Sequence, residues 1–321
     1  MSLKCIGIDI GGTSVKLGIF EEDGTLVKKW EIPTRKEENG KYILGDIAAS
    51  IRRTAKESGL ELSDFSGAGM GFPGPVLPNG HCEVCVNLGW KAGNPQQELS
   101  RLLDGMVVKS GNDANVAALG EMWQGGGKGY KNLVMVTLGT GVGGGIIING
   151  KVYSGSNFAG GELGHTVIVV DGRPCTCGRH GCWETYASAT GLIKTTKEHM
   201  KDAPKDSPIW TIVDGDESKV NGRTAFDAMR AGDPVGKAVV DEYIKYLSVG
   251  LTDMINIFQP AILCIGGGIC NEGETLLAPV RAFIDREQYA MNSTKKTKVC
   301  KAQLGNDAGI IGAALLGKQE D

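Results

Sequence analysis

The apolar positions of the chain recur with two different periods. Segments in which apolar residues return every three or four positions predict helices, at 46–58, from 94, at 112–123, at 234–258 and from 305. Short apolar runs bounded by glycine predict buried strands, at 67–72, 106–110 and 261–265. Strands and helices alternate along the chain, which is typical of an α/β fold.

Two further segments share one organisation. At 6–20 and again at 133–150, apolar runs lie on both sides of a short turn rich in glycine and threonine. This arrangement predicts two strands joined as a hairpin. Because the two hairpins open two halves of the chain, they indicate a duplicated α/β domain with a ligand between the halves.

Capping residues and prolines set the helix boundaries. Asn94 is a favourable N-cap, and Pro260 ends the segment 234–258. Residues 194–218 are charged and irregular, and they predict a helix followed by a surface loop. The last apolar run, 309–316, must bury its side chains, and we expect it to dock on the N-terminal domain.

Length and charge restrict the possible functions. A chain of 321 residues is long enough for two domains. The net charge of −3 offers no electrostatic basis for binding nucleic acid or an anionic membrane. No apolar run is as long as a membrane span. The N-terminus begins with a predicted buried strand, Lys4–Asp9, in place of a signal peptide, so we expect a cytoplasmic protein.

Nine cysteines, an odd number, argue against a disulfide framework and for a reducing compartment. Cys5, Cys264 and Cys300 lie among apolar residues and are expected in the core. Cys82 and Cys85 have the spacing of a redox pair or of half a zinc site. No thioredoxin-like pattern surrounds them, and a loop or an edge strand is the simpler interpretation.

Four residues in one stretch are suited to a metal. Cys175, Cys177 and Cys182 lie close together, and His165 precedes them across a predicted turn. Three thiolates and one imidazole complete a tetrahedral shell for a structural zinc ion. His180 is an alternative ligand, but we favour His165 because His180 lies inside the tight loop between two of the cysteines.

Three carboxylates are candidates for binding or catalysis. Glu162 and Glu184 flank the metal cluster, and two carboxylates beside a rigid metal site suggest acceptors for a polyhydroxy ligand. Asn112 and Asp113 follow a strand and start a helix, so an N-cap is one interpretation. The alternative makes Asp113 a base that takes a proton from a substrate hydroxyl, with Asn112 aligning the substrate.

Two glycine-rich turns have the chemistry of phosphate-binding loops. In the segment 9–13, glycines let backbone N–H groups approach phosphate oxygens, Thr13 adds a hydroxyl donor, and Asp9 would hold magnesium through water. The alternative is an ordinary hairpin. The segment 139–144 matches the spacing of the dinucleotide fingerprint, but a strand follows where that motif requires a helix. Two such turns would grip one triphosphate from both sides.

These motifs, in this order, resemble the ROK family (repressor, open reading frame, kinase) of bacterial sugar kinases, within the actin-like ATPase superfamily. The resemblance covers essentially the full length and is carried by the segments 9–13, 71–75, 112–115, 137–144, 161–165, 175–184 and 266–268. Residues 87–90 also match the family, whereas 81–85 depart from its usual run. Among its members the chain is most similar to the ATP-dependent kinases of glucose.

The resemblance implies an actin-like ATPase (ribonuclease H-like) fold, an α/β architecture with two domains flanking a central cleft. Residues 1–122 with 305–321 would form the smaller domain, and 123–304 the larger. The implied cofactors are ATP, Mg²⁺ and a structural Zn²⁺. The implied partners are a hexose substrate and, as a homodimer, a second copy of the chain.

The resemblance also implies a role for each site residue. Asp113 would deprotonate the sugar 6-hydroxyl for attack on the γ-phosphate. The sugar hydroxyls would contact Gly74, Asn112, Asp113, Glu162, His165 and Glu184. His165 would also bind zinc, together with Cys175, Cys177 and Cys182. ATP would contact Asp9, Gly11, Gly12, Thr13, Lys16, Thr137, Gly139, Thr140, Gly141, Gly266, Gly267 and Gly268.

Other functions occur in the same family. A sugar-responsive repressor carries a DNA-binding helix-turn-helix before the first hairpin, and Asp9 leaves no room for one here. A catalytically inactive sugar-binding module is disfavoured because Asp113 and both glycine-rich turns are present. Among sugar kinases glucose is the leading substrate, and N-acetylmannosamine, fructose, mannose and allose are the alternatives.

Overall fold

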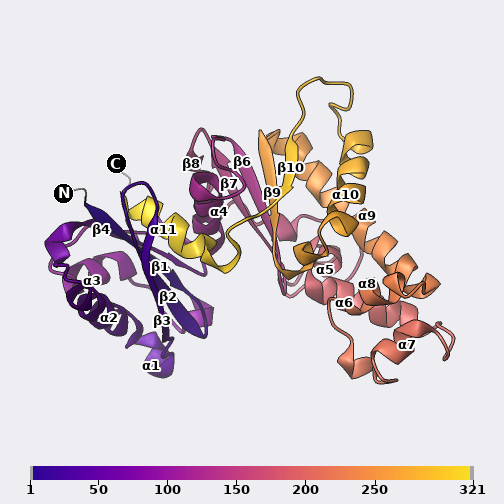
Figure 1. Cartoon of the computed structure of the whole chain (residues 1–321), viewed down its shortest axis with the longest axis horizontal. Coiled ribbons are helices and arrows are strands. Elements are labelled where there is room, and N and C mark those ends of the chain that lie inside the picture. The colour runs from indigo at the N-terminus through magenta and orange to yellow at the C-terminus, as the bar shows by residue number, and fades with distance from the viewer. Residues whose placement is uncertain (1–2, 319–321) are drawn as a thin grey trace. The chain divides into compact units, whose positions relative to one another are not determined.

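The structure, a computed structural model, describes residues 3–318 (Figure 1). Contacts between residues divide the chain into two compact units. Within the described residues, the first unit comprises 3–133, 145–161 and 303–318, and the second comprises 134–144 and 162–302.

The division into two domains, 1–122 with 305–321 and 123–304, stays a prediction. The units drawn from contacts differ from them chiefly at residues 145–161, which join the first unit. A reason for this is that Gly145 packs against Ala114 and Ala118. Residues 1–2 and 319–321, at the ends of the predicted smaller domain, lie outside the described residues.

The first unit contains a five-stranded sheet of order β3-β2-β1-β4-β5. Its strands are β1 (Lys4–Ile10), β2 (Ser14–Phe20), β3 (Leu26–Pro33), β4 (Phe65–Phe72) and β5 (Val108–Asn112). The pairs β1–β2 and β2–β3 are antiparallel, whereas β1–β4 and β4–β5 are parallel. The first predicted hairpin is thus confirmed. The strand predicted at 106–110 begins two residues later, because the Met106 N–H donates to the Leu103 carbonyl in a turn.

The helices of the first unit cover this sheet. They are α1 (Glu37–Gly40), α2 (Ile43–Glu57), α3 (Pro95–Leu102), α4 (Asp113–Gln124) and α11 (Ala308–Lys318), with the 3₁₀-helices η1 (Leu62–Asp64), η2 (Val86–Leu88) and η6 (Gly305–Asp307). The helix predicted at 46–58 starts earlier, at Ile43, whose side chain is buried in the core with Ile47 and Ile51. The Asn94 N-cap is confirmed, since its side chain accepts from the Gln97 N–H at 2.9 Å.

The C-terminal helix α11 docks on the sheet of the first unit, as predicted. It packs against β1 and β4. Its Ile310 forms an apolar cluster with Cys5 and Phe20, so Cys5 is a core residue as expected. A close approach is possible because Gly69 has no side chain: a Cβ there would lie 1.8 Å from the Ala313 carbonyl oxygen.

The second sheet has the order β10-β9-β6-β7-β8. Its strands are β6 (Leu133–Leu138), β7 (Val142–Ile148), β8 (Lys151–Val152), β9 (Ile262–Gly266) and β10 (Lys298–Lys301). Strands β6 and β7 are neighbours, as the second predicted hairpin requires. Cys264 is fully buried on β9 as expected, whereas its register partner Cys300 on β10 is only half-buried.

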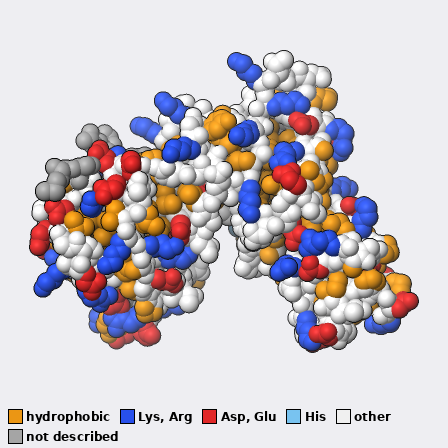
Figure 2. Space-filling model, in the orientation of Figure 1, with side chains coloured by type: hydrophobic (Ala, Val, Ile, Leu, Met, Phe, Trp, Pro, Cys, Tyr) orange, Lys and Arg blue, Asp and Glu red, His pale blue; other side chains and the backbone are white. Residues whose placement is uncertain are grey.

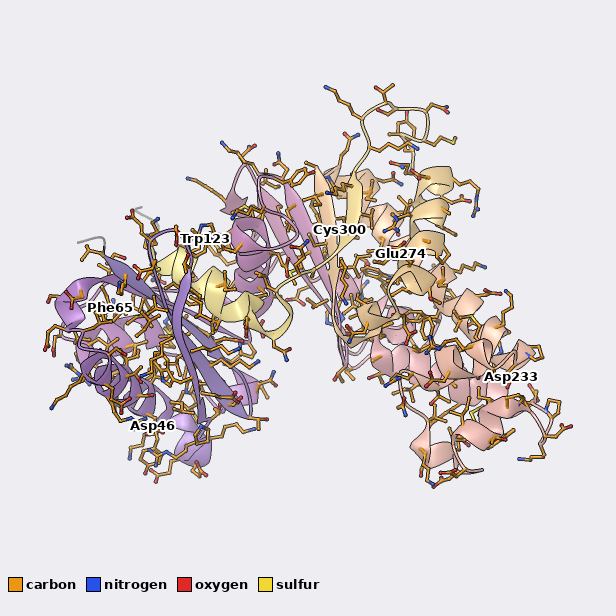
Figure 3. All side chains as sticks on the ribbon, viewed as in Figure 1. Asp46, Phe65, Trp123, Asp233, Glu274 and Cys300 are labelled. Atoms are coloured by element: carbon orange, nitrogen blue, oxygen red, sulfur yellow. The ribbon has the colours of Figure 1, made fainter. Side chains whose placement is uncertain are left out.

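The remaining helices belong to the second unit. They are α5 (Glu184–Ala187), α6 (Ala189–Met200), α7 (Pro208–Ile212), α8 (Thr224–Arg230), α9 (Pro234–Phe258) and α10 (Glu274–Glu287), with η3 (Leu163–His165), η4 (Glu217–Lys219) and η5 (Gly268–Glu272). Helix α9 has the predicted bounds. It begins after Asp233, which Figure 3 labels. The side chain of Asp233 accepts from the Val235 N–H and from Ser207 Oγ. The charged segment 194–218 contains the end of α6 and all of α7.

The surface carries charges of both signs. Figure 2 shows Lys and Arg side chains interspersed with Asp and Glu side chains over the visible face. Among residues 3–318, no helix combines the length and apolar character needed to cross a bilayer.

Candidate active site and metal centre

The predicted site residues are divided between the two units, and the structure brings neighbours together within each. The first unit holds Asp9, Gly11, Gly12, Thr13, Lys16, Gly74, Asn112 and Asp113. The second unit holds Thr137, Gly139, Thr140, Gly141, Glu162, His165, Cys175, Cys177, Cys182, Glu184, Gly266, Gly267 and Gly268.

Asp9 and Asp113 form an acidic pair in the first unit. Asp9 is on β1, directly opposite Lys16 on β2, and its carboxylate lies beside Gly309 at the start of α11. Burial raises the pKa of Asp9, Lys16 lowers it, and the charge of Asp113 raises it. The charge of Asp113 thus disfavours ionisation of Asp9, and a cation near Asp9 would offset this effect.

Asn112 is both a helix cap and a link to the loop after β4. Its Oδ1 accepts from the N–H groups of Ala114 and Asn115, at 3.0 and 3.2 Å, so the N-cap interpretation is correct. Its Nδ2 donates to the Gly74 carbonyl at 3.4 Å. Because Asn112 caps the helix, the Asp113 side chain is not needed as the cap. The cap interpretation of Asn112 is therefore compatible with a role of Asp113 as a base.

Asp113 occupies the first turn of α4 as a half-buried carboxyl group. Its Oδ1 accepts from the Ala114 N–H at 2.8 Å. Burial raises the pKa of Asp113, and the hydrogen bond from Ala114 opposes that change. A carboxylate with a raised pKa is a better proton acceptor than an exposed one, which suits a general base.

The first glycine-rich turn is held in place by a residue that sequence reasoning missed. Thr34 donates from Oγ1 to the Gly11 carbonyl at 2.7 Å, and its N–H donates to the Thr13 carbonyl at 3.0 Å. These bonds leave the Thr13 side chain exposed. No local motif marks Thr34, because it approaches the turn through the pairing of β2 with β3.

The second glycine-rich turn lies against Glu184. The Gly139 N–H donates to the Gly141 carbonyl at 3.0 Å, which closes the turn between β6 and β7. A Cβ at Gly141 would lie 2.5 Å from Glu184 Oε2, and the Val142 N–H points to the same oxygen at 3.4 Å. Glu184 therefore borders both the turn and the metal cluster.

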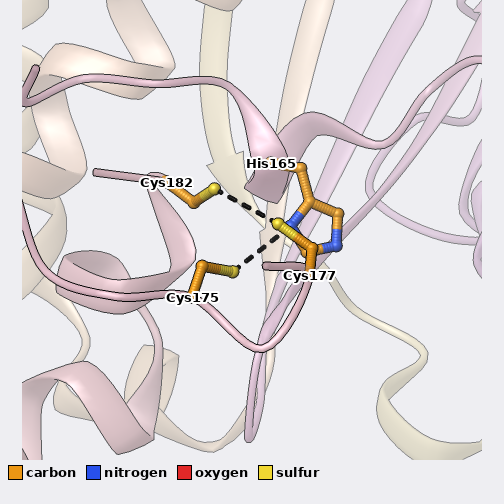
Figure 4. A group of neighbouring side chains, drawn as sticks. All are labelled: His165, Cys175, Cys177 and Cys182. Atoms are coloured by element: carbon orange, nitrogen blue, oxygen red, sulfur yellow. Dashed lines mark hydrogen bonds between the residues drawn. The ribbon is translucent and has the colours of Figure 1, made fainter. Parts of the chain in front are cut away.

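The predicted metal ligands converge (Figure 4). The ligand atoms of His165, Cys175, Cys177 and Cys182 all lie within 4.8 Å of one another. Cys175 Sγ is 3.7 Å from His165 Nδ1, and Cys177 Sγ is 3.7 Å from Cys182 Sγ. Zinc with bonds of about 2.0–2.3 Å places its tetrahedral ligands at roughly such separations. The donor set fits zinc, and the exposed His180 is not in the group found among the described residues.

The loop that carries these ligands is anchored in the core. Trp183 follows the last cysteine, is fully buried, and donates from Nε1 to the Tyr246 carbonyl on α9 at 2.9 Å. The next residue, Glu184, places Oε1 3.1 Å from Cys175 Sγ and 3.6 Å from His165 Nδ1. Glu162 is exposed and supports His165 through its carbonyl, which accepts the His165 N–H at 3.1 Å.

Cys82 and Cys85 are buried within a loop of the first unit. They form isolated bridges with Gly93 and Trp90. Burial raises the pKa of both thiols, which keeps them in the less reactive neutral form. This environment agrees with the loop interpretation of the CxxC spacing.

The chain matches known proteins along nearly its whole length. The profile of the ROK family matches residues 5–320. The chain is 39% identical to a glucokinase of Halalkalibacterium halodurans, covering 98% of this chain and 95% of that protein. It is 38% identical to a glucokinase of Thermotoga maritima, covering 99% and 98%.

A solved structure supports the same relationship. The crystal structure of a ROK family glucokinase from Streptomyces griseus, in complex with glucose and AMPPNP, is similar with a TM-score of 0.78 and 33% identity, covering 99% of this chain and 100% of that one. The predicted fold class, the actin-like ATPase fold, is confirmed by this likeness and by the two α/β sheets. The chain belongs to the ROK family.

Proposed function

We propose that this chain transfers the γ-phosphoryl group of ATP to the 6-hydroxyl of a hexose, with glucose as the preferred substrate. The observation that carries the proposal is the Asp113 carboxyl group, half-buried in the first turn of α4 beside Asn112. Family membership and the glucose and AMPPNP named for the Streptomyces griseus relative support it.

In the proposed reaction Asp113 accepts the proton of the sugar 6-hydroxyl. The hydroxyl oxygen then forms a bond to the γ-phosphorus, and the bond from that phosphorus to the β–γ bridging oxygen breaks, releasing ADP. Phosphoryl transfer depends mainly on positioning and charge stabilisation, so one carboxylate beside the nucleophile suffices. We assign the other sugar hydroxyls to Gly74, Asn112, Glu162, His165 and Glu184.

We assign the phosphates of ATP to the two glycine-rich turns. Gly11, Gly12 and Thr13 offer donors in the first unit, with Lys16 next to Asp9 across the β1–β2 pair. The remaining ATP contacts are assigned to Thr137, Gly139, Thr140, Gly141, Gly266, Gly267 and Gly268. Mg²⁺ would be held by Asp9 through water, where it neutralises charge on the phosphates. The coupling of Asp9 to Asp113 agrees with a cation near this pair.

We propose that zinc at His165 and the three cysteines is structural. The Nδ1 atom of His165 faces the thiols, which leaves Nε2 for a sugar hydroxyl. A closed Cys₃His shell has no open position for a reacting group, so zinc shapes the pocket and does not take part in phosphoryl transfer. We further expect a cytoplasmic homodimer whose product, glucose 6-phosphate, enters glycolysis.

A hexose panel tests the substrate assignment. We expect glucose to give the highest kcat/KM in a coupled assay of ADP release, by about tenfold over N-acetylmannosamine, fructose, mannose and allose. The reason is that a site that hydrogen-bonds each hydroxyl disfavours a sugar that misplaces one of them. The Asp113→Asn variant serves as the blank. A higher kcat/KM for any other sugar would replace glucose as the substrate.

The pH profile tests the state of the base. Because burial raises the pKa of Asp113, we expect the acid limb of kcat/KM to have an apparent pKa above the ordinary value of about 3.9 for aspartate. The rate should fall as pH drops through that value, since the protonated carboxyl cannot accept a proton. Initial rates across about pH 3 to 8.5, at varied glucose and saturating MgATP, measure it. An acid limb at or below the ordinary value would contradict the assignment.

A further inference from the structure

A buried acidic residue on α4 takes no part in the site described above. Glu121 is completely buried in the last part of this helix. In the described part of the chain, the hydrogen-bond partners of its carboxylate are three backbone N–H groups. Oε2 accepts from Gly126 at 2.8 Å and from Gln303 at 3.0 Å, and Oε1 accepts from Leu304 at 2.8 Å. Burying a carboxylate costs folding free energy unless hydrogen bonds of this kind satisfy its oxygens. The three N–H groups must therefore stay in place around Glu121.

The three donors lie where the chain passes between the units. The chain returns to the first unit between Ala302 and Gln303, directly after β10. Gly126 begins the connection from α4 toward β6, where the chain enters the second unit after Leu133. One carboxylate thus fastens the returning segment and the departing loop to the same helix.

The segment that Glu121 holds leads directly to the phosphate side of the site. A few residues further on, the Asn306 carbonyl accepts from Lys16 Nζ at 3.5 Å. Gly309 then packs against the carboxylate of Asp9, so closely that a Cβ there would lie 2.6 Å from Asp9 Oδ2. The position of this segment therefore sets what surrounds Asp9 and Lys16.

The same segment is packed tightly on the helix of the base. A Cβ at Gly120 would lie 2.2 Å from the Ala308 carbonyl oxygen, and one at Gly312 would lie 1.7 Å from the Val116 carbonyl oxygen. Backbones in such contact shift together, because interiors are close-packed. Helix α4 begins with Asp113, so a displacement at its Glu121 end reaches both acidic residues of the site.

We propose that Glu121 is a positioning residue for phosphoryl transfer. It holds the segment 303–309, which borders Asp9 and Lys16, in register with the helix that begins at the base Asp113. The inference rests on the proposed function, because it takes Asp113 as the base. Glu121 touches no reacting atom, and its role is to fix the distance between Asp9 and Asp113.

Glu121→Gln tests the proposal. Glutamine replaces one carboxylate oxygen by an NH₂ group, which faces N–H donors and cannot accept from them. We expect kcat to fall about tenfold or more, while the Kd of glucose measured by calorimetry without ATP changes less than about threefold. Glu98→Gln, which loses only an exposed ion pair with Arg101, is the matched control and should retain full kcat.

A second pair of variants covers the case in which Glu121→Gln does not fold. Leu304→Pro removes the N–H that reaches Oε1, and the φ of −85° at Leu304 is close to the value that proline imposes. Leu304→Ala keeps that N–H and controls for the lost side chain. We expect kcat to be lower for the proline variant than for the alanine variant, at similar glucose Kd.

The outcomes separate this inference from the assignment of the base. Folded Glu121→Gln with kcat within about twofold of the parent overturns the positioning role, and so does a loss of kcat matched by an equal loss of glucose affinity. Should Glu121→Gln fail to fold, equal kcat values for the two Leu304 variants overturn it. If Asp113→Asn is fully active, the base assignment fails first, whatever the Glu121 variants show.

Discussion

Asp113→Asn is expected to abolish phosphorylation while the protein still binds glucose. Asparagine keeps the size and the Oδ1 that accepts from the Ala114 N–H, but it cannot take the proton of the sugar hydroxyl. General-base catalysis contributes about 10²–10⁴-fold, so kcat should fall by at least 100-fold. A coupled assay of ADP release measures kcat, and calorimetry measures the Kd of glucose. This Kd should change by less than about fivefold.

The same substitution should not destabilise the protein at neutral pH. Burial raises the pKa of Asp113 in the folded state, so the folded protein holds this proton to a higher pH than the unfolded chain does. The contribution of Asp113 to stability therefore falls as pH rises from its unfolded value, about 3.9, through its folded value. Asparagine removes that loss, and we expect an equal or higher Tm at pH 7, with the advantage shrinking at acid pH.

Asp253→Asn is a matched control for this experiment. Burial also raises the pKa of Asp253, which lies on α9 and has no assigned role in the site. Its amide variant should therefore retain full kcat while showing the same direction of change in Tm. Substantial turnover by Asp113→Asn, or an equal loss of activity in both variants, would remove Asp113 as the base.

Cys177→Ala is expected to remove zinc and to lower the yield of folded protein. The variant keeps three zinc ligands, and three ligands with an exposed fourth position hold zinc less tightly than a closed shell of four does. A structural zinc site also contributes directly to the free energy of folding. We expect zinc content, measured by atomic emission, to fall from about one per chain to well below half, with a clearly lower Tm. Activity should fall as well, because His165 would lose the zinc ion that orients its imidazole ring.

Cys300→Ala is the control for a lost thiol that is not a metal ligand. Cys300 is half-buried on β10, its Sγ 3.5 Å from that of Cys264. We expect this variant to keep its zinc and nearly all of its activity. A Cys177→Ala protein that is free of zinc, as stable as the parent and fully active would refute the structural role of the metal.

Much of the fold can be predicted from the sequence, because its signals are local. The apolar repeat of residues 234–258 and the flanking Pro260 bound α9 correctly. The Asn94 cap, both glycine-rich turns and the apolar C-terminal helix are likewise encoded in contiguous residues. An element boundary differs from the prediction where a turn decides it, as at Met106 before β5.

The candidate site divides in the same way. The metal ligands are close in sequence, so their spacing already predicted a group that the fold then gathers. Asp113 stood out because a helix start follows a strand there. By contrast, the hydrogen bonds from Thr34 to the first glycine-rich turn join residues whose sequence neighbours give no hint of the contact.

The sequence by itself determined the elements, the turns and the identity of the chemical groups, since periodicity, capping and ligand spacing act over a few residues. Only the tertiary structure decided which distant groups meet. Glu121 is the clearest case: no neighbouring residue in the sequence marks it, yet its partners Gln303 and Leu304 are more than half the chain away. A buried carboxylate needs donors from whatever segment packs beside it, and no local pattern specifies that segment.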